Sequence, residues 1–191
     1  MVRLSKIYTK VGDFGETSLG NGLRISKASL RILAIGAVDE ANSAIGIARL
    51  DAEDEMDACL ARIQNDLFDL GADLSVPQDK EEPNERLRIC ASQVERLERE
   101  IDAMNKNLAP LASFILPGGT ALAARLHLAR AIVRRAECAI VELSEKGGVN
   151  PQTIRYVNRL SDHLFVMART ANNQGMGDVL WVPGANREQP I

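Results

Sequence analysis

The chain has 191 residues, 46% of them hydrophobic, which favours one domain with one sizeable core. Lysine and arginine number 23 against 26 aspartate and glutamate residues, so the net charge of -3 gives no overall field that would attract nucleic acid or anionic lipid. Residues 1–10 lack the apolar stretch of a signal peptide and no apolar run approaches the ~18 residues that span a bilayer, so we expect a cytoplasmic protein.

The segment from Ile7 to Asn21 is rich in Gly, Thr and Asp and has no hydrophobic period, so we expect a loop there. Its glycines allow backbone N–H groups to turn inward as an anion nest, Lys10 adds a positive charge, and Thr17 and Ser18 offer hydroxyl groups. This composition suits a polyphosphate, although the order of residues is not that of a P-loop and no strand precedes it. A flexible arm is an equally good interpretation of this stretch taken alone.

From about residue 30 onward, apolar residues recur at alternating steps of three and four, which predicts helices packed side by side. The first helix is expected over 30–50, the third carries a stripe from Leu87 to Leu108, and the last ends between Asn172 and Gly175. The second and fourth follow stripes over 56–74 and 122–143. The predicted fold is all-α: a five-helix bundle over 29–175 in a single domain 1–191, with an N-terminal glycine-containing loop at 1–28 and a tail at 176–191.

The three cysteines are odd in number and widely spaced, which favours neither a disulfide framework nor a zinc-binding motif. They are Cys59, Cys90 and Cys138. Because all three fall in helix-like sequence, we expect reduced core residues.

Polar residues on three of the predicted helices are candidates for a binding site. On the fourth helix, steps of three, four and three place His127, Arg130, Arg134 and Glu137 on one face apart from the apolar stripe. Two arginines one turn apart can fork around a phosphate chain, whereas a solvated charged face is the more common reason for such a stripe. Asp39 interrupts the apolar first helix, and the last helix carries Asn158 and Asp162 on one face.

Several other chemistries are excluded by missing residues. A di-metal carboxylate bundle needs Glu-x-x-His pairs, but Ala124 and Leu160 stand three residues before His127 and His163. The chain also has no Gly-x-Ser-x-Gly elbow. The loop Ala109 to Gly119 is unusually apolar for a surface connection, so function is expected there and in the N-terminal loop.

Five blocks occur in the order known from one enzyme family. They are Tyr8-Thr-Lys-Val-Gly-Asp-Phe-Gly-Glu-Thr17, Gly36-Ala-Val-Asp-Glu-Ala-Asn-Ser43, Phe114-Ile-Leu-Pro-Gly-Gly119, the Arg-Arg-Ala-Glu within Arg130 to Glu137, and Asn158-Arg-Leu-Ser-Asp162. The chain thereby resembles the PduO-type ATP:cob(I)alamin adenosyltransferases through nearly its whole length. The resemblance implies that the 5'-deoxyadenosyl group of ATP is transferred to cob(I)alamin, giving adenosylcobalamin and triphosphate.

The resemblance also implies roles for particular residues. ATP-binding roles fall on Thr9, Lys10, Gly12, Asp13, Gly15, Thr17, Ser18, Lys27, Arg134, Glu137 and Asn158. Phe114 resembles the aromatic residue beneath the corrin ring, which displaces the lower axial ligand. Arg130 resembles the arginine that pairs with an aspartate, here Asp39, across the interface of a homotrimer. Catalytic roles are thus implied for Phe114, Arg130, Arg134 and Asp39, and Mg²⁺ is expected on the ATP phosphates without a metal site made by the protein alone.

Two alternatives remain open at this point. A nucleotide-binding regulatory bundle without turnover would keep the N-terminal loop but would not need the apolar block that begins at Phe114. A purely structural bundle would not need the glycine-containing loop. Expected partners are a second and third copy of the chain, a corrinoid substrate, a flavin reductase and a cobalamin-dependent enzyme. The sequence does not identify the electron donor or the range of corrinoids.

Overall fold

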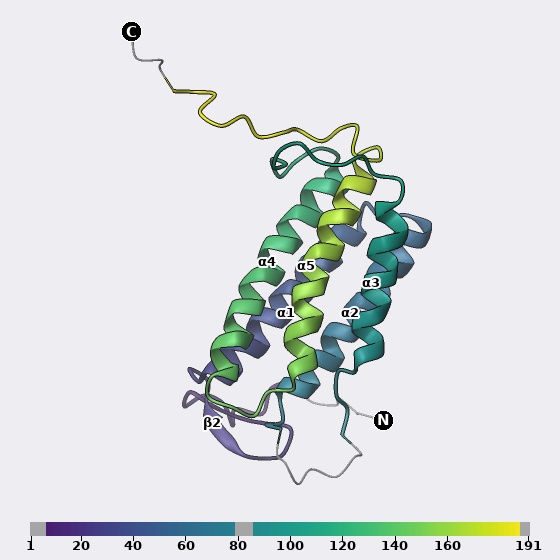
Figure 1. Ribbon diagram of the computed structural model, residues 1–191. Coiled ribbons are helices and arrows are strands. Elements are labelled where there is room, and N and C mark those ends of the chain that lie inside the picture. Colours follow the sequence, from purple (N-terminus) through teal and green to yellow (C-terminus); the bar gives the residue numbers. More distant parts are fainter. Residues whose placement is uncertain (1–6, 79–85, 188–191) are drawn as a thin grey trace.

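The computed structural model describes residues 7–78 and 86–187, which form five helices and one short hairpin (Figure 1). The helices are α1 (Leu30–Arg49), α2 (Asp54–Leu74), α3 (Ala91–Asn105), α4 (Ala121–Ser144) and α5 (Pro151–Ala171). Helix α1 packs against α2 and α4, while α5 packs against α3 and α4. The prediction of an all-α five-helix bundle is confirmed. In the described ranges, no helix combines the length and apolar character needed to cross a membrane.

Polar residues cap the helices that carry the candidate site. Ser29, Thr120 and Asn150 precede α1, α4 and α5, and each side chain accepts a hydrogen bond from a backbone N–H of the first turn. Pro151 then occupies the first position of α5, where its missing N–H costs nothing. These caps determine where the helices begin and therefore where the loops that precede them attach.

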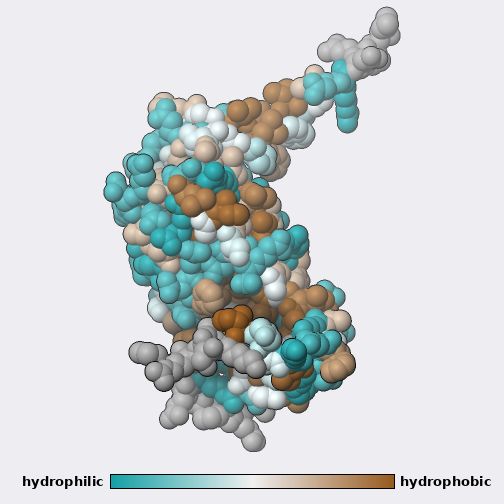
Figure 2. All heavy atoms as spheres, turned by 180° about the vertical axis from the view of Figure 1, so that it is seen from behind, coloured by the Kyte–Doolittle hydropathy of each residue, from teal (hydrophilic) through white to brown (hydrophobic). Residues whose placement is uncertain are grey.

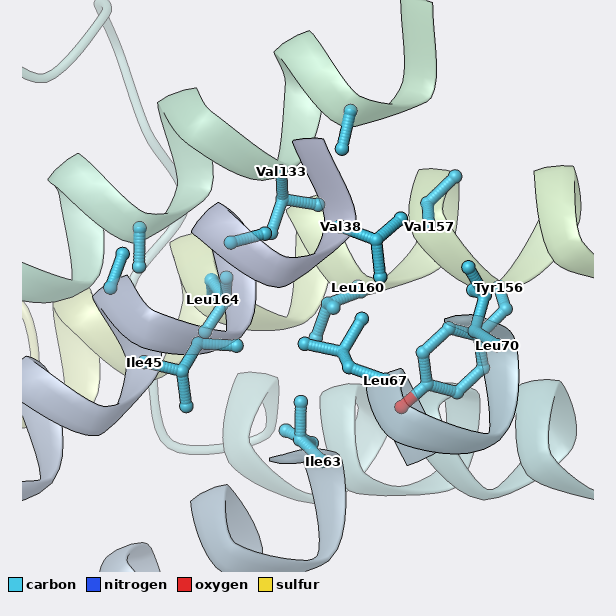
Figure 3. Packing of buried hydrophobic residues seen from close by; sticks show 14 of the residues in the cluster. Val38, Ile45, Ile63, Leu67, Leu70, Val133, Tyr156, Val157, Leu160 and Leu164 are labelled. Carbon is cyan, nitrogen blue, oxygen red and sulfur yellow. The ribbon is translucent and has the colours of Figure 1, made fainter. Parts of the chain in front are cut away.

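The apolar stripes of all five helices meet in one core (Figure 3). Ile45, Leu67, Val133 and Leu160 come from four different helices and are at most 2% exposed. Burying one such side chain contributes about 1.5 to 3 kcal/mol. The periodicity seen in the sequence is therefore explained by burial along the bundle axis.

The buried carboxylate of Asp66 on α2 forms polar contacts with α3 and α5. Asp66 on α2 accepts a hydrogen bond from the Tyr156 hydroxyl of α5 at 2.7 Å and another from Gln93 of α3 at 3.0 Å. It also forms an ion pair with Arg96 of α3. A buried carboxylate is tolerated only when its oxygens are satisfied in this way. The network orients α3 and α5 relative to α2.

The two ends of the bundle carry different connections. The hairpin of β1 (Glu16–Ser18) and β2 (Arg24–Ser26) lies at the end where α1 begins, and the Gly20 N–H donates to the Ser75 carbonyl at 3.1 Å. The opposite end carries the loop 106–120 and the segment 172–187, which extends away from the bundle (Figure 1). In the view from behind, hydrophobic atoms lie along the first part of this extended segment (Figure 2).

Three expectations about local structure were wrong. Leu87 precedes α3 rather than lying in it and is 56% exposed, and Leu108 follows the helix. The third stripe therefore predicted a helix that was too long at both ends. Of the cysteines, only Cys59 is buried, because Cys90 is the exposed N-cap residue of α3 and Cys138 lies on the outer face of α4. The hairpin was not expected either, because its strands are too short to show a period of two.

Candidate functional site

The N-terminal loop is held against β2 and the residues that follow it by two cationic side chains. The Lys27 ammonium donates to the Gly12 carbonyl at 2.8 Å, and its backbone N–H donates to the Gly15 carbonyl at 2.8 Å. Arg24 donates to the Val11 carbonyl at 3.1 Å. Two N–H groups of the loop are engaged within it, since Asp13 donates to the Lys10 carbonyl and Gly15 to the Gly12 carbonyl, both at 3.3 Å. An ammonium group has three donors, so Lys27 also retains donors for an anion.

The loop needs unusual backbone angles at two positions. Lys10 and Gly15 have φ values of 62° and 82°, the left-handed region that turns a chain sharply. The side chains of Thr9, Asp13 and Ser18 are exposed on this loop, and that of Thr17 is partly buried. The structure thus gathers the predicted ATP-binding residues of 9–18 and Lys27 in one place.

The second part of the site is a pair of arginines on α4. Arg130 is half-buried and its Nε has no hydrogen-bond partner, while Arg134 lies one turn further on and is exposed. Among the residues that the structure describes, neither guanidinium takes part in an ion pair. Burial lowers the pKa of Arg130, and the positive charge of Arg134 lowers it further. Two neighbouring cations without a counter-charge form a favourable place for an anion.

Glu137 and Asn158 form a contact between α4 and α5. The Asn158 amide donates to the Glu137 carboxylate at 2.8 Å, so two residues predicted to bind ATP are brought together. By contrast, Arg135 turns away from this face and forms an ion pair with Glu40 of α1. The face of α4 that carries Arg134 and Glu137 is thereby separated from the surface charge of Arg135.

His127 lies on the same side of α4, two turns before Arg134, but it is buried. Its ring is 3% exposed and makes an edge contact with Phe165 at a centroid distance of 6.1 Å. Burial lowers the pKa of His127, and the charge of Arg130 lowers it further. The expectation that all four polar residues lie apart from the apolar stripe was therefore wrong for His127, which is buried between α4 and α5.

Asp39 lies on α1 at a hollow between α1 and α2. Ile35, Phe68 and Gly71 also line this hollow. Its carboxylate is exposed, and no contact joins it to Arg130 within the described chain. Phe68 is 72% exposed although it is a large apolar residue. The predicted Asp39–Arg130 pair is thus not formed inside one chain.

Phe114 is held firmly and yet exposed. Its carbonyl accepts a hydrogen bond from the Trp181 N–H at 2.7 Å, and the two rings lie 6.1 Å apart at 55°. Next to it, Ile115 and Leu180 form an antiparallel bridge. The Phe114 ring remains 76% exposed, so it is not a core residue.

The Gly118-Gly119 pair after Phe114 allows the loop to pack closely against the Asn172 side chain at the end of α5. Gly119 has a φ of 101°, and a Cβ there would lie 2.4 Å from the Asn172 side chain. That side chain accepts from the Thr120 N–H at 3.3 Å, immediately before α4 begins. A side chain at position 119 would push the loop away from α5 and move Phe114 with it.

The N-terminal loop and Phe114 lie at opposite ends of the bundle (Figure 1). Helix α4 has 24 residues and runs from one end to the other. At a rise of 1.5 Å per residue it spans about 36 Å. The predicted site residues of one chain are therefore divided into two groups, with the arginine pair of α4 between them.

Two contributing residues were not predicted. Trp181 orders Phe114 through main-chain hydrogen bonds, and only its position in a hydrophobic stretch near the C-terminus could have drawn attention to it. Arg24 anchors the N-terminal loop from a strand that was too short to predict.

The fold and site define an all-helical protein with an anchored N-terminal loop, two neighbouring arginines on α4 that form no ion pair with any described residue, and a separate exposed aromatic ring. The sequence profile of the family described as cobalamin adenosyltransferase matches residues 7–171. The chain belongs to this family.

Relatives with related names align with most of the chain. A corrinoid adenosyltransferase of Mycobacterium tuberculosis is 46% identical over 191 residues, covering 97% of each chain. A cobalamin adenosyltransferase of Cupriavidus metallidurans is 48% identical, covering 94% of this chain and 95% of its own. Corrinoid adenosyltransferase PduO of Salmonella typhimurium is 41% identical over 87% of this chain but only 50% of its own length.

Solved structures show the same fold. A variant of the PduO-type ATP:corrinoid adenosyltransferase from Lactobacillus reuteri, complexed with cobalamin and ATP, superposes with a TM-score of 0.84. It is 38% identical, and the match covers 92% of this chain and 99% of that chain. A second variant of that protein, complexed with ATP, gives a TM-score of 0.83 at 36% identity.

Proposed function

We propose that the protein is an ATP:corrinoid adenosyltransferase, which transfers the 5'-deoxyadenosyl group of ATP to cob(I)alamin and releases triphosphate. The observation that carries the proposal is Phe114, an aromatic ring held by main-chain hydrogen bonds and yet 76% exposed. A bundle that only binds a nucleotide, the alternative reading, has no use for such a ring. Membership in the family supports the same activity.

The corrinoid is the substrate on which Phe114 acts. Cobalt(II) with an axial ligand resists reduction, whereas a four-coordinate ion is easier to reduce to cobalt(I). An apolar ring placed against the lower face of the corrin displaces that ligand. Cobalt(I) then donates an electron pair to the ribose 5' carbon, a cobalt–carbon bond forms, and the bond from that carbon to the triphosphate oxygen breaks. No general base is needed, so the protein's contribution is alignment and charge stabilisation.

The triphosphate leaves with several negative charges, and this chain offers cations to meet them. We assign that role to Lys10, Lys27 and Arg134, together with the backbone N–H groups of the loop. Oxygen atoms of exposed Asp13 and partly buried Thr17 fit a hard cation such as Mg²⁺, which would shield the phosphate charge when bound. The Glu137–Asn158 pair offers an acceptor and an amide to the nucleoside part of ATP.

We further propose that the active unit is a homotrimer in which neighbouring chains share each site. The loop and Phe114 lie at opposite ends of a bundle whose helix α4 spans about 36 Å, too far to reach the two ends of one reacting pair. Arg130 has a buried Nε without a partner, and Asp39 lies beside exposed Phe68 on another face. A contact between the Arg130 of one chain and the Asp39 of the next would satisfy both groups.

The activity itself is tested by mixing the protein, ATP and chemically reduced cobalamin and following the absorption spectrum. We expect the spectrum of cobalt(I) to be replaced by that of the alkylated corrinoid, with one triphosphate released per corrinoid. Binding of ATP without this spectral change would favour the regulatory bundle instead.

The shared site is tested by charge reversal. Asp39→Arg and Arg130→Asp should each lower activity and trimer content, while the double variant should recover part of both. Glu40→Arg is the matched control, because it disturbs an ion pair inside the chain and should leave the trimer intact. A monomer with full activity in light scattering would refute the shared site.

A cytoplasmic location, a flavin reductase as electron donor and a cobalamin-dependent enzyme as the acceptor of the product stay predictions of the same proposal. So does the division into one domain with loop, bundle and tail. The reductase and the acceptor enzyme follow from the chemistry, because cobalt(I) needs a reductant and adenosylcobalamin is itself a cofactor.

A further inference from the structure

A second group of reactive side chains lies away from the arginine pair, on the face made by α2, α3 and α5. Cys59, Glu100 and His163 come one from each helix, and their ligand atoms lie within 4.8 Å of one another. The Cys59 sulfur is 3.2 Å from Glu100 Oε2 and 3.7 Å from His163 Nε2, and His163 Nε2 is 2.8 Å from Glu100 Oε2. The cysteine and histidine are buried, and the glutamate is partly exposed.

These separations approach those of a tetrahedral metal site. A zinc ion with ordinary bonds to sulfur, nitrogen and oxygen places the three ligand atoms about 3.4 to 3.6 Å apart. The sulfur–oxygen separation of 3.2 Å and the sulfur–nitrogen separation of 3.7 Å differ from these values by a few tenths of an ångström. The nitrogen–oxygen separation of 2.8 Å is shorter by a larger amount. A small rotation of the partly exposed Glu100 side chain opens that last distance.

Glu100 is already oriented by its other oxygen. Arg62 donates to Glu100 Oε1 at 3.2 Å, which leaves Oε2 facing the cysteine and the histidine. A ligating carboxylate is commonly held by such an outer contact. Arg96 lies 3.8 Å from the same Oε1 but is engaged with Asp66. With Cys59 as a thiolate and Glu100 ionised, the two negative charges balance one divalent cation.

The cluster opens into a hollow of about 280 Å³ at the surface. Met56, Met104 and Met167 form part of its wall, so the lining near the cluster is soft and apolar. The rim carries polar groups, among them Asn107 and Thr170. A three-ligand site beside a hollow leaves the fourth coordination position to water or a small ligand.

In the metal-free cluster, the Cys59 sulfur and the His163 ring carry protons that a bound cation would displace or move. Burial and the nearby Glu100 charge raise the pKa of Cys59 to about 12, so the sulfur carries its proton and donates to the carboxylate. Burial works to raise the pKa of Glu100, but hydrogen bonds from His163 and Cys59 lower it to about 2. His163 Nδ1 is buried without a partner. The histidine can therefore turn Nε2 into a metal ligand only by moving a proton to an unpaired Nδ1.

We propose that Cys59, Glu100 and His163 form a binding site for a thiophilic divalent cation, best represented by zinc, separate from the ATP and corrinoid site. On binding, the cysteine sulfur gains a bond to the metal and releases its proton to solvent. The Nδ1 proton lacks an acceptor, so affinity should be micromolar rather than the much tighter binding of closed structural sites. The site could not be predicted from the sequence, because Glu100 lies 41 residues after Cys59 and 63 residues before His163, and this spacing matches no motif.

The test uses metal-free protein without ATP or corrinoid, with cobalt(II) as the spectroscopic probe. The starting protein is the Cys90→Ser/Cys138→Ser double variant, in which Cys59 is the single remaining cysteine. We expect a thiolate-to-cobalt charge-transfer band that saturates at one ion per chain and is displaced by zinc. Because both replaced cysteines are exposed, the double variant keeps the fold.

Further variants assign the other ligands in the same background. Cys59→Ser should abolish the band, and Glu100→Gln should weaken cobalt binding by about 10- to 100-fold. Zinc should raise the melting temperature of the double variant and not that of Cys59→Ser. Zinc titrations in buffers of different ionisation enthalpy should show about one proton released per ion.

Absence of the band in the double variant would overturn the proposal, and this result does not depend on any change to a buried residue. An equal band in Cys59→Ser, or unchanged affinity in Glu100→Gln, would likewise overturn it. The cluster would then be a hydrogen-bonded part of the interior only.

Discussion

Phe114→Ala tests whether the Phe114 ring has a functional role or only packs in the core. The exposure of the ring determines how much folding free energy the substitution should cost. Phe114 is 76% exposed, so about a quarter of its side chain is buried. With ~200 Å² for the ring and ~25 cal/mol per Å², Phe114→Ala should cost about 1 kcal/mol of folding free energy. A phenylalanine in the core would cost ~3 to 5 kcal/mol. For a chain of this size, 1 kcal/mol lowers the melting temperature by ~2 to 4 °C.

Activity should respond quite differently from stability. If the ring displaces the lower ligand, Phe114→Ala should lower the rate from cobalt(II) at least about tenfold more than the rate from preformed cobalt(I). The assay measures both rates, ATP affinity and a thermal melt on the same preparation. Leu50→Ala is the matched control, since Leu50 is 77% exposed and lies outside the site. Equal loss in both assays, or a melting temperature lowered as for a core residue, would refute the role of the ring.

Other predictions concern the arginine pair and the loop that carries the ring. Arg134→Ala should raise the Michaelis constant for ATP by ~10- to 150-fold, because a charge-assisted hydrogen bond is worth ~1.5 to 3 kcal/mol. Arg135→Ala removes only an exposed ion pair and should leave that constant unchanged; equal effects in steady-state kinetics would remove Arg134 from the site. Gly119→Ala should destabilise the protein by ~1 to 3 kcal/mol, because its φ is 101° and the new Cβ would meet Asn172 at 2.4 Å. Gly118→Ala meets nothing within 4 Å and should melt like the wild type; similar melts for both variants would contradict this reasoning.

The helices were predictable because burial repeats along them. Leu60 and Ile140 lie in stripes that the core requires, and their spacing is visible in the sequence. The C-terminal end of α3 could not be predicted, because Leu108 lies in a loop and yet is apolar and only 9% exposed. Hydrophobic spacing cannot distinguish a buried loop residue from another turn of helix. The hairpin was missed because three-residue strands are too short to show alternation.

The candidate site was predictable where its parts are local in the chain. The spacing of Arg130 and Arg134 places them one turn apart whatever the tertiary structure. The contact of Glu137 with Asn158 depends on how α4 meets α5, and the contact of Phe114 with Trp181 joins residues far apart in sequence. Such pairs are created by packing, so only the structure reveals them. The role of Phe114 was expected from the resemblance alone, since no spacing rule indicates an exposed aromatic ring.

The hydrogen bonds that order Phe114 come from residues beyond those that the family profile matches. The family profile ends at residue 171, whereas the backbone groups that meet the Phe114 loop belong to Val179 and Trp181. Changes in this segment can shift the ring without altering any residue of the shared blocks. We therefore expect substitutions in residues 176–187 to change the rate with the corrinoid through the position of the Phe114 ring, while the affinity for ATP stays the same.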